Sequence, residues 1–149
     1  MLVPAGLLAG AYGSQHLGGL SPCEMCYWQR YAHFAAIAFA AASFPLARLP
    51  DQGRSLVWLA ALAILASGAI GAYHAGVEAG IFEGATQCSS LSSGSRDVVA
   101  DIMSASLVRC DQVQWELFSI SMAGWNAIIS GLFALVTLWL SLRRPRIRT

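Results

Sequence analysis

Three long, mostly apolar stretches limit what this chain can fold into more than any other feature. They run from about Trp28 to Ala47, from Leu56 to Val77 and from about Ile120 to Leu142, and the last two contain no charged residue. A helix needs about 20 mostly apolar residues to cross the hydrocarbon core of a bilayer. Each stretch is that long, so the sequence predicts three helices that span a membrane.

The composition of the chain supports a location in the membrane. Charged residues make up only 11% of its 149 residues, whereas soluble domains carry roughly 25%. Because a small domain leaves much of its surface in water, so few charges argue against a soluble enzyme. The high hydrophobicity excludes a disordered chain, and a net charge of +1 gives no reason to expect nucleic-acid binding. The length indicates a single membrane domain over residues 1–149.

A fourth candidate helix, at about residues 2–15, is uncharged but short. At about 1.5 Å per residue it barely crosses the hydrocarbon core, so either this helix is thin or the natural chain begins upstream. A cleaved signal peptide is the alternative, but it requires a basic segment, and no basic residue precedes Arg30. Gly6 and Gly10 form a GxxxG pattern, which predicts close packing against another helix of the bundle, with dimerisation as the alternative.

The charged residues are sorted by side. If the chain spans the membrane four times, six of its nine arginines lie on the same side, namely Arg48, Arg54, Arg143, Arg144, Arg146 and Arg148. The positive-inside rule makes that side cytoplasmic. Seven of the eight acidic residues fall on the other side, with its loops at about 16–22 and 78–119. We therefore expect an all-α, four-helix integral membrane bundle with both termini in the cytoplasm and spans at about 2–15, 28–47, 56–77 and 120–142.

All four cysteines are expected on the outer side. Cys23 and Cys26 form a CxxC at a helix start, and Cys88 and Cys110 lie in the second outer loop. An oxidising compartment permits disulfides. Of the three possible pairings, the economical one joins the two cysteines of each loop. A zinc site of four cysteines is the alternative, but such a site usually has a second close pair, and 21 residues separate Cys88 from Cys110.

The residues around the CxxC predict a helix start. The run from Ser21 to Glu24 combines a typical N-cap, a proline suited to the first helical position and the glutamate of a capping box. The first turn of a helix favours a thiolate. Arg30 follows Cys26 by four residues, and His33 continues the same face. An arginine at the edge of the hydrocarbon is costly, so Arg30 either snorkels to the headgroups or holds a thiolate or an electronegative ligand beside Cys26.

The second outer loop has two parts. Residues 89–95 are rich in serine and glycine, which indicates a flexible segment. Apolar residues then recur at helical spacing from Val98 to Leu107, which predicts a short amphipathic helix on the membrane surface. A disulfide in such a loop is accessible to another protein, whereas the alternative is a purely structural staple. With the CxxC beside Arg30, the loop pair suggests electron flow from a soluble dithiol to a lipid-soluble quinone.

This arrangement resembles a known family. The run from Ser21 to Tyr31, SPCEMCYWQRY, is similar to the P-C-x-x-C-x-x-x-R signature of DsbB-type disulfide bond formation proteins. The four spans, the later cysteine pair and the segment from Cys110 to Asn126 match as well, so the resemblance covers nearly the whole chain. The short first span without a basic flank departs from the family pattern.

The resemblance implies a protein-dithiol:quinone oxidoreductase of the bacterial inner membrane, with its cysteines on the periplasmic side. A reduced, thioredoxin-like DsbA-type protein would attack the loop disulfide, with Cys88 forming the mixed disulfide and Cys110 as its partner. Cys110 would then exchange with Cys23 and free Cys26 as a thiolate facing the quinone, either ubiquinone or menaquinone. Arg30 matches the arginine that supports quinone binding in this family.

Two histidines and two other functions complete the sequence-based expectations. His33 and His74 are candidates for quinone binding; His74 and Glu78, spaced i, i+4, alternatively form an ordinary polar pair at the interface. A non-enzymatic membrane protein with structural disulfides is one alternative function. A vitamin-K-epoxide-reductase-like enzyme is another, because it also joins a CxxC, four helices and quinone chemistry. The order of cysteines and helices favours the DsbB-type interpretation.

Overall fold

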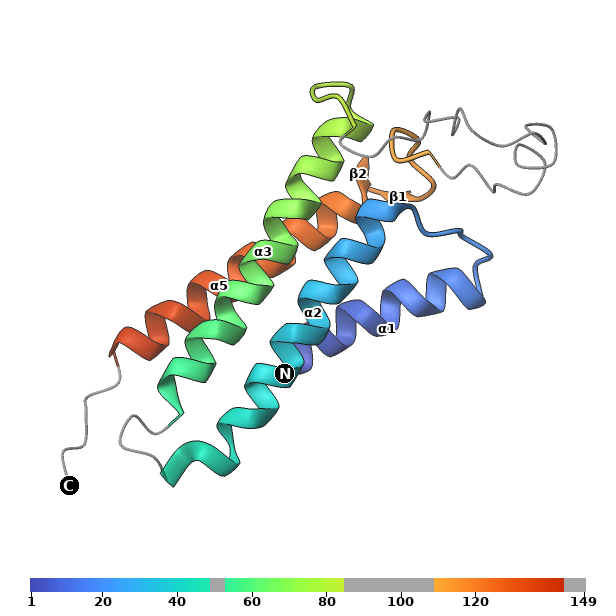
Figure 1. The fold of residues 1–149 in the computed structure, drawn as a ribbon. Coiled ribbons are helices and arrows are strands. Elements are labelled where there is room, and N and C mark those ends of the chain that lie inside the picture. The colour runs from blue at the N-terminus through green and yellow to red at the C-terminus, as the bar shows by residue number, and fades with distance from the viewer. Residues whose placement is uncertain (49–52, 85–108, 144–149) are drawn as a thin grey trace, which may run out of the picture.

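The computed structural model describes residues 1–48, 53–84 and 109–143. This part of the chain holds four α-helices: α1 (Leu2–His16), α2 (Glu24–Ser43), α3 (Arg54–Glu78) and α5 (Met122–Arg143). A 3-10 helix, η1 (Pro45–Arg48), follows α2, and an antiparallel hairpin precedes α5, with strands β1 (Glu116–Leu117) and β2 (Ile120–Ser121). The predicted all-α fold class is confirmed (Figure 1).

Helix α3 packs against both α2 and α5 and forms the centre of the bundle (Figure 1). Small residues allow its backbone to approach α5 closely. A Cβ atom at Gly71 would lie only 2.9 Å from the carbonyl oxygen of Ala123, and one at Gly68 would lie 3.2 Å from the Cβ of Ser130. Such close approach is how helices associate in lipid, where no hydrophobic force drives them together.

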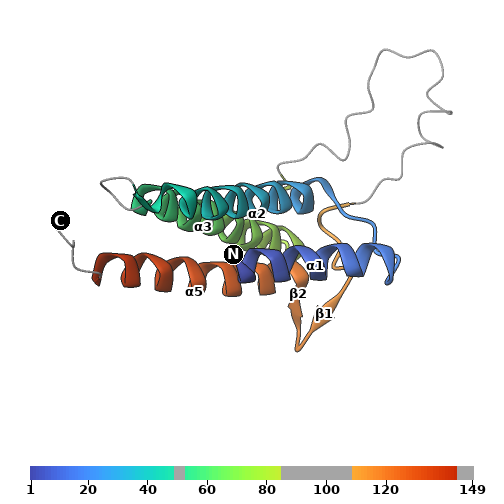
Figure 2. The same ribbon diagram turned by 90° about the horizontal axis from the view of Figure 1, so that it is seen from below.

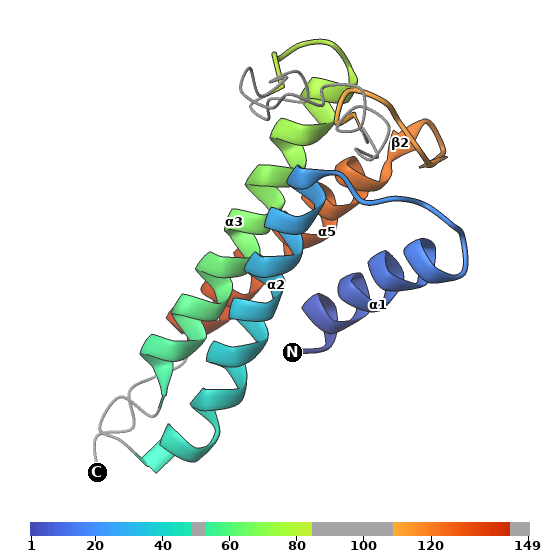
Figure 3. The same cartoon turned by 45° about the vertical axis from the view of Figure 1, so that its right-hand side comes forward.

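Helix α1 diverges from the other three helices (Figure 3). Its contacts with α2 and α5 are few compared with those inside the bundle. A Cβ atom at Gly6 or Gly10 would meet nothing within 4 Å, so the prediction that this GxxxG packs tightly against a helix is wrong. Both glycines instead line a cavity, because the diverging helix leaves space on that face.

The observed ends of the elements differ from the predicted ones. Helix α2 ends at Ser43, earlier than expected, because Pro45 has no backbone N–H to continue the hydrogen-bond pattern of the helix. The hairpin was not expected; its two turn residues, Phe118 and Ser119, have φ of 53° and 59°, as a two-residue type I′ turn requires. Figure 2 shows this hairpin projecting away from the helices. The amphipathic helix predicted from Val98 to Leu107 lies outside the described residues.

The end of the bundle far from the CxxC carries arginines stacked on tryptophans. The Arg143 guanidinium lies 3.8 Å from the ring centre of Trp139, and that of Arg54 lies 5.7 Å from the ring centre of Trp58. Trp58 Nε1 also donates a hydrogen bond to Ser141 Oγ at 2.8 Å, which joins α3 to α5. These two helices are long and apolar enough to cross a membrane, and tryptophan and arginine at matching ends are typical of a membrane interface.

Candidate active site

The two cysteines of the CxxC lie at the start of α2. Cys23 is the N-cap residue with extended backbone angles (φ −79°, ψ 172°), and Cys26 lies in the first turn. The expected capping box is wrong, because the helix begins after Ser21 and makes no side-chain cap hydrogen bond. The carbonyl oxygen of Ser21 instead accepts a hydrogen bond from Gln114 Nε2 at 2.8 Å, which keeps this segment outside the helix.

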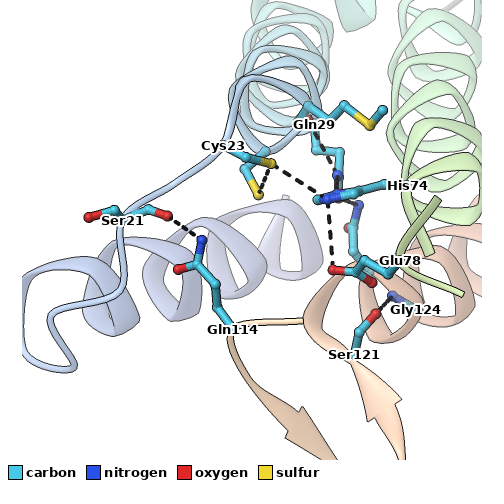
Figure 4. Close-up of polar contacts among 11 residues, drawn as sticks. Ser21, Cys23, Gln29, His74, Glu78, Gln114, Ser121 and Gly124 are labelled. Carbon is cyan, nitrogen blue, oxygen red and sulfur yellow. Dashed lines mark hydrogen bonds and ion pairs between the residues drawn. The ribbon is translucent and has the colours of Figure 1, made fainter. Parts of the chain in front are cut away.

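The sulfur atoms of the pair are in hydrogen-bond contact. Cys23 Sγ lies 3.2 Å from Cys26 Sγ and 3.5 Å from His74 Nε2 of α3 (Figure 4). Cys23 is almost completely buried. Its hydrogen bond to Cys26 and its burial raise the pKa of the Cys23 thiol to about 12. The hydrogen bond from Cys23 lowers the pKa of the Cys26 thiol, so in the dithiol state Cys26 ionises before Cys23.

A third cysteine joins this pair from a distant part of the sequence. Cys110 is buried and packs with Cys23, Met25 and Val77 in one cluster, against which Cys26 also packs. Next to it in the chain, Arg109 Nε donates to Asp111 Oδ1 at 2.9 Å, and this ion pair lowers the pKa of the exposed Asp111 carboxyl. Thiol–disulfide exchange needs one sulfur to approach another directly, and the cluster brings Cys110 into the same packed region as the CxxC.

Arg30 is buried beneath the cysteine pair and is held by α1. Its Nη1 donates to Gln15 Oε1 at 2.6 Å and its Nη2 to the carbonyl oxygen of Ala11 at 3.1 Å. The Tyr12 ring centre lies 4.6 Å from the guanidinium carbon. Arg30 Nε has no hydrogen-bond partner among the described residues. The guanidinium therefore keeps a buried N–H at Nε for a ligand and a positive charge that acts on Cys26.

A network of buried polar side chains crosses the bundle below His74. Gln29 Nε2 lies 3.1 Å from His74 Nδ1, and Asn126 Nδ2 of α5 donates to Gln29 Oε1 at 2.7 Å. Asn126 Oδ1 lies 2.9 Å from His33 Nε2, which is also 3.0 Å from Ser67 Oγ. The network thus connects the environment of Cys23 to the bundle interior through side chains of α2, α3 and α5.

Backbone carbonyls set the direction of these hydrogen bonds, because a carbonyl oxygen only accepts. Asn126 Nδ2 donates to the carbonyl oxygen of Ser67 at 3.2 Å, so its other amide atom, Oδ1, is an acceptor. Gln29 Nε2 donates to the carbonyl oxygen of Met25 at 3.3 Å and therefore also acts as a donor toward His74 Nδ1. Since Nδ1 of His74 accepts, the proton of the neutral ring is on Nε2, facing Cys23.

The location of the His74 proton on Nε2 argues against the alternative of a metal site. The ligand atoms of Cys23, Cys26 and His74 all lie within 4.8 Å of one another, close enough to hold a metal ion. A metal would bind the lone pair of His74 Nε2, and the other ring nitrogen would then donate to an acceptor, as metal-bound histidines do. Here the Gln29 amide N–H occupies the Nδ1 side. The donor set therefore suits a dithiol with a hydrogen-bonding histidine better than a metal centre.

A cavity of about 480 Å³ lies between α1 and the cysteine end of the bundle. Small-molecule sites typically measure roughly 300–1,000 Å³ and are mostly apolar with a few polar groups. Gly6, Leu7, Leu8, Gly10 and Ala11 supply the α1 side of this cavity. The opposite side is polar and includes five residues that the sequence analysis selected as candidates, Cys23, Cys26, Arg30, His33 and His74. The sixth, Cys110, lies in the adjoining cluster, and Cys88 lies outside the described residues.

The sequence analysis missed the residues that connect these candidates. Gln15 accepts a hydrogen bond from Arg30, and Gln29 contacts His74. Asn126 joins three helices. A signal for two further members existed, since Ser67 and Ser130 are polar residues inside uncharged spans, and a polar residue inside a span commonly marks an interior face.

Comparison with known proteins places the chain in a family. The family described as Disulfide bond formation protein DsbB matches residues 1–140. This chain belongs to the DsbB family. Two relatives are both named Disulfide bond formation protein B. The one from Albidiferax ferrireducens is 30% identical, and the match covers 96% of this chain and 84% of the relative. The one from Marinobacter nauticus is 26% identical, and the match covers 96% of this chain and 88% of the relative. No solved structure matches the chain. As a DsbB-family protein it is a helical membrane protein of disulfide bond formation.

Proposed function

We propose that this protein reoxidises a periplasmic DsbA-type dithiol protein and passes the two electrons to a membrane quinone, ubiquinone or menaquinone. One observation carries the proposal. Cys110 packs against the Cys23–Cys26 pair, and the pair borders an apolar cavity that also contains Arg30. Such an arrangement supports electron transfer from a loop cysteine to the CxxC and from there to a lipid-soluble acceptor.

The relay conserves electrons at each step. The partner's two thiols reduce the Cys88–Cys110 disulfide, with Cys88 in the mixed disulfide, and leave as a disulfide. Cys110 attacks Cys23, which forms a Cys23–Cys110 disulfide and releases Cys26 as a thiolate. Cys88 then attacks Cys110, which restores the Cys88–Cys110 disulfide and releases Cys23 as a thiol, so two electrons now reside on the CxxC. Burial of Cys23 and Cys110 in one cluster supports this exchange, because it places the two residues in the same packed region.

The cavity has the properties that a quinone site needs. A quinone accepts two electrons and two protons and so restores the disulfide. Leu7, Leu8 and the glycines of α1 provide an apolar wall for a lipid-soluble ring. Arg30 Nε is a buried donor without a partner in the described part of the chain, and a buried unpaired donor is unfavourable until it finds an acceptor. A quinone carbonyl is such an acceptor, so these residues fit the group.

The same end of the molecule is proposed to face the periplasm. In this topology residues 1–149 form one membrane domain with cytoplasmic termini. The ends of α3 and α5 that lie far from the cysteines each carry an arginine beside a tryptophan. These pairs support a cytoplasmic location for that end, because arginine is enriched on the cytoplasmic side and tryptophan at both interfaces.

The decisive experiment is turnover of a reduced DsbA-type protein with the purified protein and a quinone. We expect turnover by the wild type and none after Cys23→Ser, Cys26→Ser, Cys88→Ser or Cys110→Ser. Arg30→Ala is expected to raise the quinone KM by about tenfold or more, since a hydrogen bond to a charged group is lost. Arg54→Ala, at the far end of the bundle, is the matched control. Full activity of any cysteine variant, or cysteines that stay oxidised when the quinone is withdrawn, would contradict the proposal.

A further inference from the structure

His33 has a buried nitrogen that the proposed relay does not use. The side chain is 3% exposed and lines the cavity. Its Nδ1 has no hydrogen-bond partner among the residues that the structure describes. Polar atoms at such depth are nearly always paired, so an unpaired one on a cavity wall indicates a ligand.

The other ring nitrogen of His33 is committed as a donor. Nε2 lies 2.9 Å from Asn126 Oδ1 and 3.0 Å from Ser67 Oγ. Asn126 Oδ1 carries no proton, and the hydroxyl proton of Ser67 goes to the carbonyl oxygen of Gln29 at 3.1 Å. Two acceptors therefore face Nε2, which must hold the proton. In the neutral ring Nδ1 is then an acceptor only.

We propose that His33 Nδ1 accepts a hydrogen bond from a hydroxyl of the reduced acceptor, the quinol, and that the site thereby binds quinol more tightly than quinone. The inference rests on the proposed function and goes beyond it by assigning the preference between the two ligand forms. A quinone offers only carbonyl acceptors and gives His33 Nδ1 nothing to bind. A quinol offers hydroxyl donors, which Nδ1 can accept.

The position of His33 suits this role. It follows Cys26 by seven residues on α2, which corresponds to about 10 Å along the helix axis. Both residues line the cavity, with Arg30 between them in the chain. The thiol end of the cavity therefore offers charge and donors, and the deeper end offers an acceptor. Tighter binding of the quinol favours reduction of the bound acceptor, and a tenfold preference corresponds to about 30 mV for a two-electron couple.

The test measures binding in a protein that cannot turn over. In the Cys23→Ser, Cys26→Ser double variant, the dissociation constants of a short-chain ubiquinone and of its quinol are determined by tryptophan fluorescence quenching. We expect the quinol to bind about fivefold to tenfold more tightly, the range expected for one neutral hydrogen bond. His33→Gln is expected to remove this preference by weakening quinol binding alone, because its amide N–H replaces the Nε2 donor and nothing replaces Nδ1. His33→Asn, whose Oδ1 lies near the position of Nδ1, should restore part of it.

Controls separate the possible failures. Phe34→Leu changes an exposed neighbour on α2 and should leave both constants unchanged. Thermal unfolding of each variant verifies the fold. Equal weakening of quinone and quinol by His33→Gln, or an unchanged ratio, would overturn the inference while the proposed function stands. Binding of neither ligand by the parent protein would overturn both.

Discussion

Cys23 and His74 lie 51 residues apart in sequence, yet Cys23 Sγ and His74 Nε2 are 3.5 Å apart. Because Gln29 donates toward Nδ1, the imidazole presents an N–H to this sulfur. The sulfur of Cys23 gains negative charge whenever it leaves or attacks in a thiol–disulfide exchange. We therefore expect His74 to stabilise Cys23 in the exchange step that releases it from the proposed Cys23–Cys110 disulfide, without a change in the covalent bonds of His74.

Replacing His74 should slow that exchange. His74→Phe keeps a ring of similar size and removes the N–H donor, and a hydrogen bond to a charged group contributes about 1.5–3 kcal/mol. We expect the release of Cys23 from the Cys23–Cys110 disulfide to slow by about tenfold to a hundredfold. Rapid acid quenching followed by alkylation and mass spectrometry measures the rate.

A neighbouring residue on α3 provides the control. Tyr73 is exposed, and its hydroxyl donates to the carbonyl oxygen of Glu83 at 2.7 Å, away from the cysteines. Tyr73→Phe should leave the exchange rate unchanged. If His74→Phe exchanged as fast as the wild type, the N–H of His74 would have no role at the sulfur.

The two sulfurs of the CxxC should differ sharply in reactivity with pH. The raised pKa of Cys23, about 12, keeps this thiol protonated at pH 8, and only a thiolate is alkylated. Iodoacetamide should therefore modify Cys26 first in the reduced protein, and Cys23 only as the pH rises toward 12. In Cys26→Ala the largest cause of the raised pKa is gone, so Cys23 should be alkylated at lower pH. Equal labelling of both cysteines at pH 8 in the wild type would contradict the assignment.

The helices could be predicted because apolar length is a local property. Long uncharged runs predict the ends of α3 and α5 to within two residues, and the short first helix is predicted as well. The start of α2 could not be predicted, because the carbonyl of Ser21 is taken by Gln114 from a segment 93 residues later. The prediction of tight packing at the GxxxG of α1 failed for a similar reason, since the pattern does not specify whether a helix or a cavity lies beside Gly6.

The candidate residues could be predicted in type but not in arrangement. The CxxC and Arg30 share one helix, so spacing alone places them on one face. The packing of Cys110 with Cys23 depends on contacts between residues far apart in the sequence, which no local pattern encodes. The network around Asn126 depends on the rotation of three helices about their axes, and these rotations are set by packing at residues such as Gly71.

Asn126 should be important for stability because it joins three helices. Its side-chain nitrogen donates hydrogen bonds to Gln29 and Ser67, and its side-chain oxygen accepts one from Ser130 Oγ at 2.9 Å. Asn126→Leu would leave several buried polar groups unpaired, each at a cost of about 1–3 kcal/mol. We expect the free energy of unfolding in detergent to fall by at least about 1 kcal/mol, measured by chemical denaturation.

The control for Asn126 lies on the same helix. Thr137 Oγ1 donates to the carbonyl oxygen of Phe133 in its own helix, at 2.7 Å, and this hydrogen bond is exposed. Thr137→Val should change the free energy of unfolding by less than about 0.5 kcal/mol. Equal effects of the two substitutions would show that the network contributes no specific stability.

The glycines of α1 allow a direct test of the cavity. Gly10 lines the cavity, whereas Gly13 does not, and a Cβ at either position meets nothing within 4 Å. Both positions therefore accept a larger side chain without a backbone clash, and leucine favours a helix more than glycine does.

Gly10→Leu should block acceptor binding while the cysteines remain competent. The leucine side chain would fill part of the 480 Å³ cavity, so we expect the KM for quinone to rise by about tenfold or more, as for a loss of about 1.4 kcal/mol in binding. Exchange among the cysteines in a single turnover should keep its wild-type rate, because the substitution touches none of them. Gly13→Leu makes the same change outside the cavity and should leave both measurements unaltered. A parallel rise in KM for both variants would mean that leucine perturbs α1 as a whole, and an unchanged KM for Gly10→Leu would place the acceptor outside this cavity.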